Sequence, residues 1–243
     1  MRHVIAPLAV CALVLAGCGM AGPEIRTTCD PAEWCPVRLM VLAPCAAAGA
    51  IPPGTTFPEG VTPVTLPEAI AATGSALVEG LRLTATAVES SLLVAFSRTE
   101  TAALAEAVNR QYLDTRTLDP ASARALGEAL GVEAYLVTAI LRYGPEVDAD
   151  AQQVSKGVGT SVKTTDVGIN VAGTYIMVYY NAHVRTALVR SADGAVMWDA
   201  ASRQRERRGA LRTVTQASVL KAAVDTLMAG FPWRAVEPDH PDH

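Results

Sequence analysis

Two long strands joined by a tight turn constrain the fold of this chain more than any other feature. A long strand is expected over residues 174–191, with apolar and polar residues alternating from Asn181 onward. The turn follows at Asp193-Gly194, a pair of residues typical of β-hairpins when alternating strands flank it. Residues 195–202 then predict the return strand, with Trp198 packed in the core. The chain is therefore expected to contain an antiparallel sheet.

Other segments predict helices and strands that must pack against this hairpin. Helix starts and stops are marked by Asp119-Pro120 and by Gly131, which favour an N-cap and a left-handed C-cap. The expected order is a buried strand at 37–45, a helix at 66–90, a short strand at 92–96, helices at 97–113 and 118–130, a strand at 133–143, the hairpin, and a helix at 218–229. This β-α-β-α-α-β-β-β-α order predicts an α+β fold, with helices packed on a mixed sheet of about five strands.

The first residues have the layout of a secretory signal. A short basic start precedes an apolar run over residues 4–17, which is too short to span a bilayer, since about 20 residues are needed. The run ends in Leu15, Ala16, Gly17 and Cys18, which resemble the lipobox of bacterial lipoproteins. The alternatives are an ordinary secretory signal with a chance cysteine, or an uncleaved anchor helix.

The lipobox resemblance implies that Cys18 receives a diacylglycerol and becomes the first mature residue. A lipid anchor would hold the protein on a membrane facing the periplasm, and Gly19 after the cysteine implies sorting to the outer membrane. The domain boundaries follow as a signal peptide at 1–17, a lipidated tether at 18–36, a folded periplasmic domain at 37–232 and a disordered tail at 233–243.

Three further cysteines lie early in the mature chain. An oxidising compartment permits disulfides, and Cys29 and Cys35 could close a small loop between them. Cys45 would then stay odd, at the end of an apolar run where a buried thiol is common. A zinc site is disfavoured because no histidine lies near these cysteines in the sequence, so we expect no metal.

The sequence contains little that favours catalysis. The folded region has one histidine, His183, in the middle of an expected strand, and no Gly-x-Ser-x-Gly motif accompanies it. Gly157-Val158-Gly159 lacks the Gly-Lys-Ser/Thr ending of a phosphate-binding loop. We therefore expect no enzyme and no cofactor. The formal net charge of −4 also argues against nucleic-acid binding.

One dense basic run follows the hairpin, at Arg203, Arg205, Arg207 and Arg208. Guanidinium groups bind phosphates and carboxylates in a bidentate manner, so the run could contact a lipid headgroup, an acidic partner or peptidoglycan carboxylates. The alternative is a solvated strand end neutralised by nearby acidic residues.

Five phrases, in this order, resemble the periplasmic domain of curli-secretion-channel-like lipoproteins, a fold shared by Lpo-type activators of penicillin-binding proteins. They are VRLMVLAP from 37, LLVAFSRTETAAL from 92, LDPASARALGEALGVEAYLVTAILRY from 118, VRTALVRSADGAVMWDAAS from 184 and TQASVLKAAVDTLMAGFP from 215. The resemblance spans roughly residues 37–232. It implies a non-enzymatic lipoprotein that binds a protein partner, assists assembly or activation of an envelope machine, and could self-associate.

The resemblance also raises an alternative function, an oligomeric outer-membrane secretion channel. The curli channel forms its pore from two amphipathic hairpins of each subunit. Residues 154–173 lie where the first hairpin would fall, although a flexible surface loop is the preferred interpretation. Between the hairpin and the final helix, the chain is too short and too charged for a second one.

Overall fold

The computed structural model describes residues 22–31, 33–36, 38–52, 55, 65–84, 99–148, 169–171, 174–207 and 214–233. The lipobox residues Leu15, Ala16, Gly17 and Cys18, the strand expected at 92–96 and Arg208 lie outside these ranges. Among the described residues, no helix combines the length and apolar character needed to cross a membrane.

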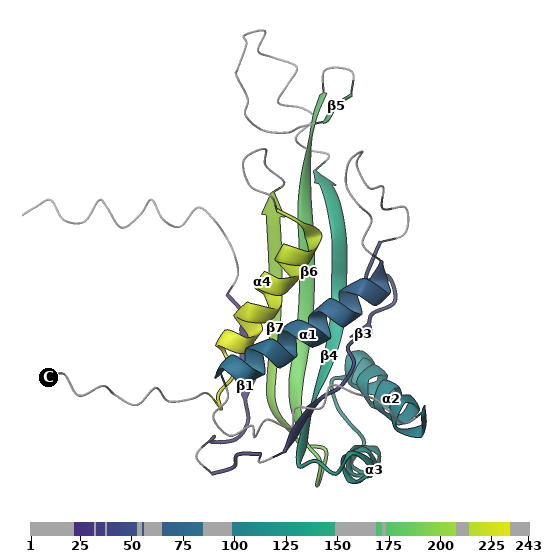
Figure 1. The fold of residues 1–243 in the computed structure, drawn as a ribbon, viewed down its shortest axis with the longest axis vertical. Helices are drawn as coiled ribbons and strands as arrows, with labels where there is room; N and C mark the ends of the chain where they lie inside the picture. The colour runs from purple at the N-terminus through teal and green to yellow at the C-terminus, as the bar shows by residue number, and fades with distance from the viewer. Residues whose placement is uncertain are drawn as a thin grey trace, which may run out of the picture.

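Three long antiparallel strands form the centre of the molecule. They are β4 (Ala134–Asp148), β6 (Thr174–Arg190) and β7 (Val196–Arg207). β6 lies between the other two and pairs with both. The predicted hairpin is confirmed as β6 and β7, and β7 extends five residues past the expected end at Ser202. Figure 1 shows the three strands running side by side along the long axis of the molecule.

Short strands complete the sheet, in the order β1-β7-β6-β4-β2. β1 (Glu24–Thr27) is antiparallel to β7, whereas β2 (Leu39–Val41) and β3 (Cys45–Ala46) are parallel to successive parts of β4. Because β2 and β3 cover one edge in two pieces, the sheet is five strands wide. The α+β fold with a mixed sheet and packed helices is confirmed.

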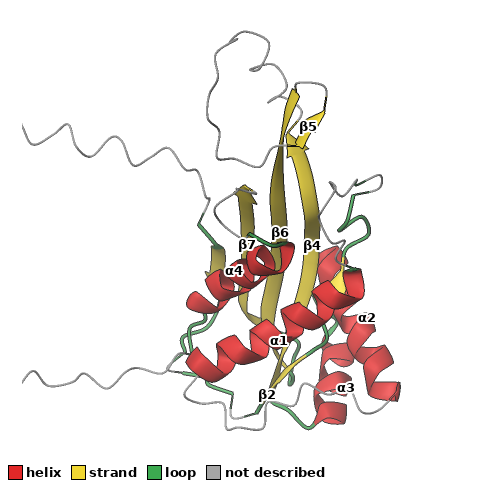
Figure 2. Cartoon of the chain, turned by 45° about the horizontal axis from the view of Figure 1, so that its top comes forward, coloured by secondary structure: helices red, strands yellow, loops and turns green. Residues whose placement is uncertain are grey.

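Helices cover the two faces of the sheet unequally. α1 (Leu66–Thr84) and α4 (Gln216–Ala229) pack against each other and on one face, as Figure 2 shows. On the opposite face lie α2 (Thr99–Thr115) and α3 (Pro120–Leu130), at the lower end of the sheet. Each face has its own apolar core, one centred on Trp198 and Leu188 and the other on Tyr112 and Tyr135. The prediction of Trp198 as a core residue is confirmed.

Local signals explain where the helices begin and end. The carboxylate of Asp119 accepts a hydrogen bond from the backbone N–H of Ser122, which caps α3, and Pro120 opens the helix. Gly131 ends it with φ of 67°, and its N–H donates to the carbonyl of Glu128. At α4, Thr215 and Ser218 form a reciprocal capping box.

Both predicted boundaries of the folded domain are wrong. Residues Glu24–Thr27, which the sequence placed in the tether, form β1 and pair with Trp198 to Ala201 of β7. Trp233, placed in the disordered tail, is 5% exposed and packs edge-on against Trp34. The Trp233 indole N–H also donates to the Trp34 carbonyl at 2.7 Å. Both errors arise because the residues that hold these segments, on β7 and at Trp34, lie far from them in the sequence.

A third correction concerns residues 154–173, where a flexible surface loop is the preferred expectation. Within this range, Ile169–Val171 form strand β5, which pairs antiparallel with Thr174 to Ile176 at the start of β6. The remaining residues of the range lie outside the described part of the chain.

A buried ion pair holds α2 on the sheet. Arg185 of β6 donates to both carboxylate oxygens of Asp199 on β7, at 2.9 and 2.6 Å, and the two side chains are only 10% and 14% exposed. Tyr112 of α2 donates its hydroxyl to Asp199 at 2.8 Å. The Asp199 carboxylate therefore receives three hydrogen bonds, two from β6 and one from α2, and so joins three elements.

We predict that Asp199→Asn destabilises the protein by about 3 kcal/mol, because a neutral amide leaves the buried Arg185 guanidinium without its counter-charge. Urea unfolding followed by circular dichroism measures the change. The control is Glu106→Gln, which removes an exposed ion pair with Arg110. The control should leave the unfolding midpoint unchanged, and equal losses in the two variants would contradict the prediction.

Candidate functional site: a groove at the base of the sheet

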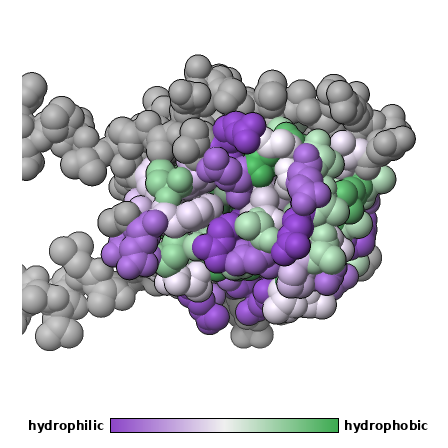
Figure 3. Space-filling view, turned by 90° about the horizontal axis from the view of Figure 1, so that it is seen from below, coloured by the Kyte–Doolittle hydropathy of each residue, from purple (hydrophilic) through white to green (hydrophobic). Residues whose placement is uncertain are grey.

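An open groove of about 560 Å³ lies at the lower end of the sheet, where β6 turns into β7 beside α3. Figure 3 views the molecule from below and shows hydrophilic residues gathered over this end, with apolar patches between them. Its volume falls in the range of ligand-binding clefts. The lining comprises Trp34, Arg38, Arg124, Gly127, Glu128, Gly131, Val132, Glu133, Arg190, Ser191 and Ala192.

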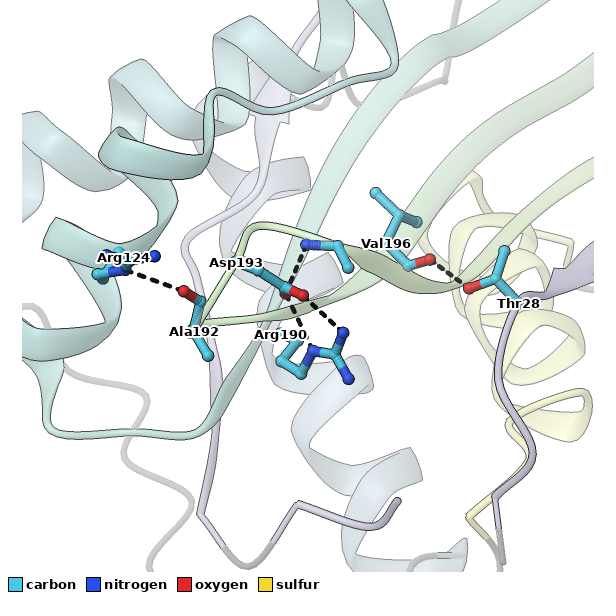
Figure 4. Close-up of polar contacts among 7 residues, drawn as sticks. Thr28, Arg124, Arg190, Ala192, Asp193 and Val196 are labelled. Atoms are coloured by element: carbon cyan, nitrogen blue, oxygen red, sulfur yellow. Dashed lines mark hydrogen bonds and ion pairs between the residues drawn. The ribbon is translucent and has the colours of Figure 1, made fainter. Parts of the chain in front are cut away.

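The β6–β7 turn forms one wall and is fixed by an ion pair. Arg190 donates to both oxygens of Asp193, at 3.0 and 2.6 Å, and Asp193 also accepts from the backbone N–H of Ala195 (Figure 4). The Arg190 guanidinium holds the pKa of Asp193 below its ordinary value. Gly194 adopts φ of 72°, and a Cβ there would come within 2.9 Å of Ala123.

Helix α3 forms the opposite wall. Arg124 donates its Nε to the Ala192 carbonyl at 2.9 Å, so the helix is tied directly to the turn (Figure 4). The helix approaches the turn so closely that a Cβ on Gly127 would come within 2.2 Å of the Ser191 Cβ. Only glycine fits at position 127 without displacing the turn.

The hydroxyl of Ser191 is the most unusual group in the groove wall. Its side chain is only 7% exposed, and its Oγ has no hydrogen-bond partner among the described residues. The backbone N–H of Ser191 is already used, donating to the Glu133 carbonyl at 2.8 Å. The Oγ lies against Gly127 of α3 and is fully buried, so this hydroxyl belongs to the packing of the turn on the helix and does not face the open space of the groove.

An aromatic chain supports the third wall. The Arg190 guanidinium lies 5.9 Å from the centroid of the Trp34 ring. Trp34 packs edge-on against Trp233, which contacts Phe231, which in turn packs edge-on against Trp198 of the core. This chain of rings ties the segment before β2 and the end of the chain to the sheet.

The charges of the groove are mixed. Arg38, Arg124 and Arg190 line it together with Glu128 and Glu133. Arg190 is paired with Asp193, whereas Arg124 uses its Nε for the turn, and its two terminal nitrogens form no hydrogen bond or ion pair within the described part of the chain. Such a surface offers both donors and carboxylates to a ligand that carries both kinds of charge.

The three cysteines within the described ranges take no part in a disulfide. Cys29, Cys35 and Cys45 are all free thiols, so the pairing of Cys29 with Cys35 suggested by the sequence is not formed. Burial raises the pKa of each thiol, which keeps all three protonated at neutral pH. Cys45 lines a second cavity of about 440 Å³ between β3, α1 and α2, and its thiol is half-buried where the sequence suggested a buried one.

Three of the four arginines of the basic run lie far from this groove. Arg203, Arg205 and Arg207 project from alternate positions of β7 on the face of the sheet that also carries α2. His183 lies opposite Arg203 across the β6–β7 pairing. Burial and the Arg203 charge lower the pKa of His183, so the ring is neutral at pH 7. Among the described residues, no group of three potential metal ligands occurs.

Sequence reasoning did not identify the groove. Its residues come from four separate segments, and none of them forms a motif by spacing alone. Gly127 is the one detectable signal. A glycine in the middle of a helix lowers helix propensity, and its presence there indicates that another segment packs closely against the helix.

Comparisons with known proteins find similarity in solved structures only. No protein-family model matches the chain, and no curated protein does. One crystal form of the PelC dodecamer from Paraburkholderia phytofirmans has a TM-score of 0.45 and 12% identity, and the match covers 87% of this chain and 99% of the PelC chain. A second crystal form has a TM-score of 0.43 and 14% identity, and the match covers 88% of this chain and 98% of the PelC chain. Lipoprotein GNA1162 from Neisseria meningitidis has a TM-score of 0.36 and 13% identity, covering 80% of this chain and 99% of that one.

We predict that Gly127→Ala destabilises the protein by about 2 kcal/mol, because the added methyl group collides with Ser191 and pushes α3 away from the turn. Gly74→Ala in α1 is the matched control, since its Cβ would meet only the Pro44 ring at 3.4 Å. The control should be neutral or more stable by up to about 1 kcal/mol, through its higher helix propensity. Thermal unfolding compares them, and equal stability of the two variants would contradict the close approach.

Proposed function

We propose that this chain is a non-enzymatic lipoprotein of the bacterial envelope, anchored through Cys18 and facing the periplasm. Its folded domain holds a segment of a partner protein in the groove beside the β6–β7 turn, which we call the basal groove. In this way it assists assembly or activation of an envelope machine. The anchor rests on the lipobox resemblance of residues 15–18. The partner site rests on the groove, and above all on Arg124 in its wall, whose terminal nitrogens form no hydrogen bond or ion pair with the described residues.

A polypeptide segment suits the chemistry of this groove. Its backbone offers carbonyl acceptors at every residue, so it can accept hydrogen bonds from the terminal nitrogens of Arg124. Side chains of either charge find a counterpart in Arg38 or Glu128 at the rim. Mixed charge disfavours a simple anion, since two carboxylates would repel it.

The lining also supports binding rather than catalysis. Among the described residues that form the groove, no histidine or cysteine occurs. The Ser191 hydroxyl lies without a base, and activation of a serine requires a neighbouring base. Walls fixed by the Arg190–Asp193 pair and by the Arg124 hydrogen bond give a preformed surface, which lowers the entropic cost of binding.

The anchor is tested with Cys18→Ser in the full precursor. We expect the variant to carry no lipid and to keep its signal sequence, because the thiol that accepts the lipid is gone. Mass spectrometry of the purified protein measures both the lipid and the N-terminus. A variant whose N-terminus matches that of the parent would refute the anchoring.

The groove is tested by photo-crosslinking in cells. Benzoylphenylalanine replacing Arg38 on the rim should give a discrete crosslinked partner, whereas the same residue replacing Lys221 on the exposed side of α4 should not. Adding Arg124→Glu should lower the crosslinked yield roughly tenfold, because a charge-assisted hydrogen bond contributes about 1.5 kcal/mol or more. Adding Arg110→Glu on α2 should leave the yield unchanged. Equal yields from both label positions would reject the groove as a partner site.

A further inference from the structure

The upper half of the sheet carries arginine side chains on the face that α2 and α3 leave open. A bulge in β4 between Ile140 and Arg142 reverses which side chains face α2, so Arg142 and Glu146 point to this side. Cross-strand pairing then aligns three rows across β4, β6 and β7. The rows are Arg142–His183–Arg203, Gly144–Asn181–Arg205 and Glu146–Tyr179–Arg207. Figure 1 shows these strands continuing upward beyond α2 and α3.

These rows form a positively charged surface that we call the arginine face. Glu146 lies between Arg142 and Arg205, at 3.6 and 4.0 Å. The Arg205 guanidinium also lies 4.0 Å from the centroid of the Tyr179 ring, which orients it across the surface. Arg203 and Arg207 are exposed on β7. Four guanidinium groups thus outnumber Glu146 and the neighbouring Glu24 of β1, and an anionic ligand is favoured.

The arginine face lies next to the point where the anchored end of the chain leaves the sheet. Glu24, the first residue of β1, pairs with Ala201, two positions before Arg203 on the same strand. Cys18 precedes Glu24 by six positions, a stretch that spans at most roughly 20 Å even when fully extended. From Ala201 to Arg207, β7 advances by about the same distance.

We propose that the arginine face lies against the headgroup layer of the membrane that holds the Cys18 lipid, and that its guanidinium groups bind the phosphates of anionic phospholipids. This inference rests on the proposed lipidation of Cys18. The connection between Cys18 and Glu24 is long enough for a lipid on that cysteine to bring phosphates to Arg203, Arg205 and Arg207. Arginine is suited to this role, because its planar group binds phosphate through two parallel hydrogen bonds.

The position favours a membrane over an acidic protein as the occupant. β1 begins at Glu24, opposite Ala201, so no described strand covers the outer edge of β7 from Ser202 onward, and the three arginines lie along that uncovered edge. The short connection between a lipidated Cys18 and Glu24 keeps the bilayer surface close to this edge. A protein bound to the three arginines would have to displace that surface. The basal groove lies at the opposite end of β6 and stays accessible.

Vesicle binding by the mature chain with Cys18→Ser, which carries no lipid, tests the arginine face independently of the anchor. We expect the protein to co-sediment with vesicles of phosphatidylcholine and phosphatidylglycerol in equal parts, but not with vesicles of phosphatidylcholine alone, and to dissociate as salt is added. The double variant Arg203→Gln/Arg205→Gln should bind the anionic vesicles roughly 25-fold more weakly, at roughly fivefold per residue.

The matched control is Arg110→Gln/Lys221→Gln, which removes the same net charge from α2 and α4 and should keep the parent affinity. Equal weakening by both double variants, or equal binding to both kinds of vesicle, would overturn the arginine face as a membrane contact. Retention of vesicle binding by the Arg203/Arg205 variant, together with loss of the partner crosslink, would assign the face to an acidic protein instead. These outcomes do not depend on whether Cys18 is lipidated, which the precursor experiment measures separately.

Discussion

The pairing of β6 with both of its neighbours is the constraint on which the rest of the structure depends. β6 is bonded along most of its length to β4 on one side and to β7 on the other, so its two ends occupy fixed places more than ten residues apart. The lower end closes through Arg190 and Asp193 and shapes the groove. The upper half carries Asn181, His183 and Tyr179 in register with the arginines. Both surfaces therefore follow from one register, and a slip of one residue would turn every side chain to the other face.

A polar contact that crosses three elements secures this register where the helices end. Asp199 receives hydrogen bonds from Arg185 and Tyr112, which fixes α2 to the β6–β7 pair. Above this level the second face has no described helix, and it changes from apolar to charged within a few residues. The apolar core below and the arginine face above are thus divisions of a single sheet surface, separated at the Arg185–Asp199 pair.

The sequence predicts much of this arrangement because its strongest signals are local. Alternation from Asn181 onward and the Asp193-Gly194 turn were sufficient to predict the hairpin. Asp119-Pro120 and Gly131 were sufficient to predict α3. β1 has only four residues, all exposed, so no apolar pattern identifies it, and its strand conformation depends on the edge of β7. Trp233 is buried only because Trp34 lies beside it. The groove depends on the same kind of long-range contact, and therefore no spacing in the sequence indicates it.

The position of β1 changes what an anchor at Cys18 would do to the domain. With a tether reaching residue 36, the domain could rotate freely and lie far from the lipid surface. With β1 beginning at Glu24, the free connection shortens to the residues between 18 and 24, and it meets the sheet at a fixed place on β7. A short connection at a fixed point restricts the orientations available to a rigid domain. Contacts between the arginine face and phosphates would restrict them further, because both act on the same edge. The groove, at the other end of β6, would then be directed away from the bilayer, where a partner in the periplasm could reach it without competing with the lipids.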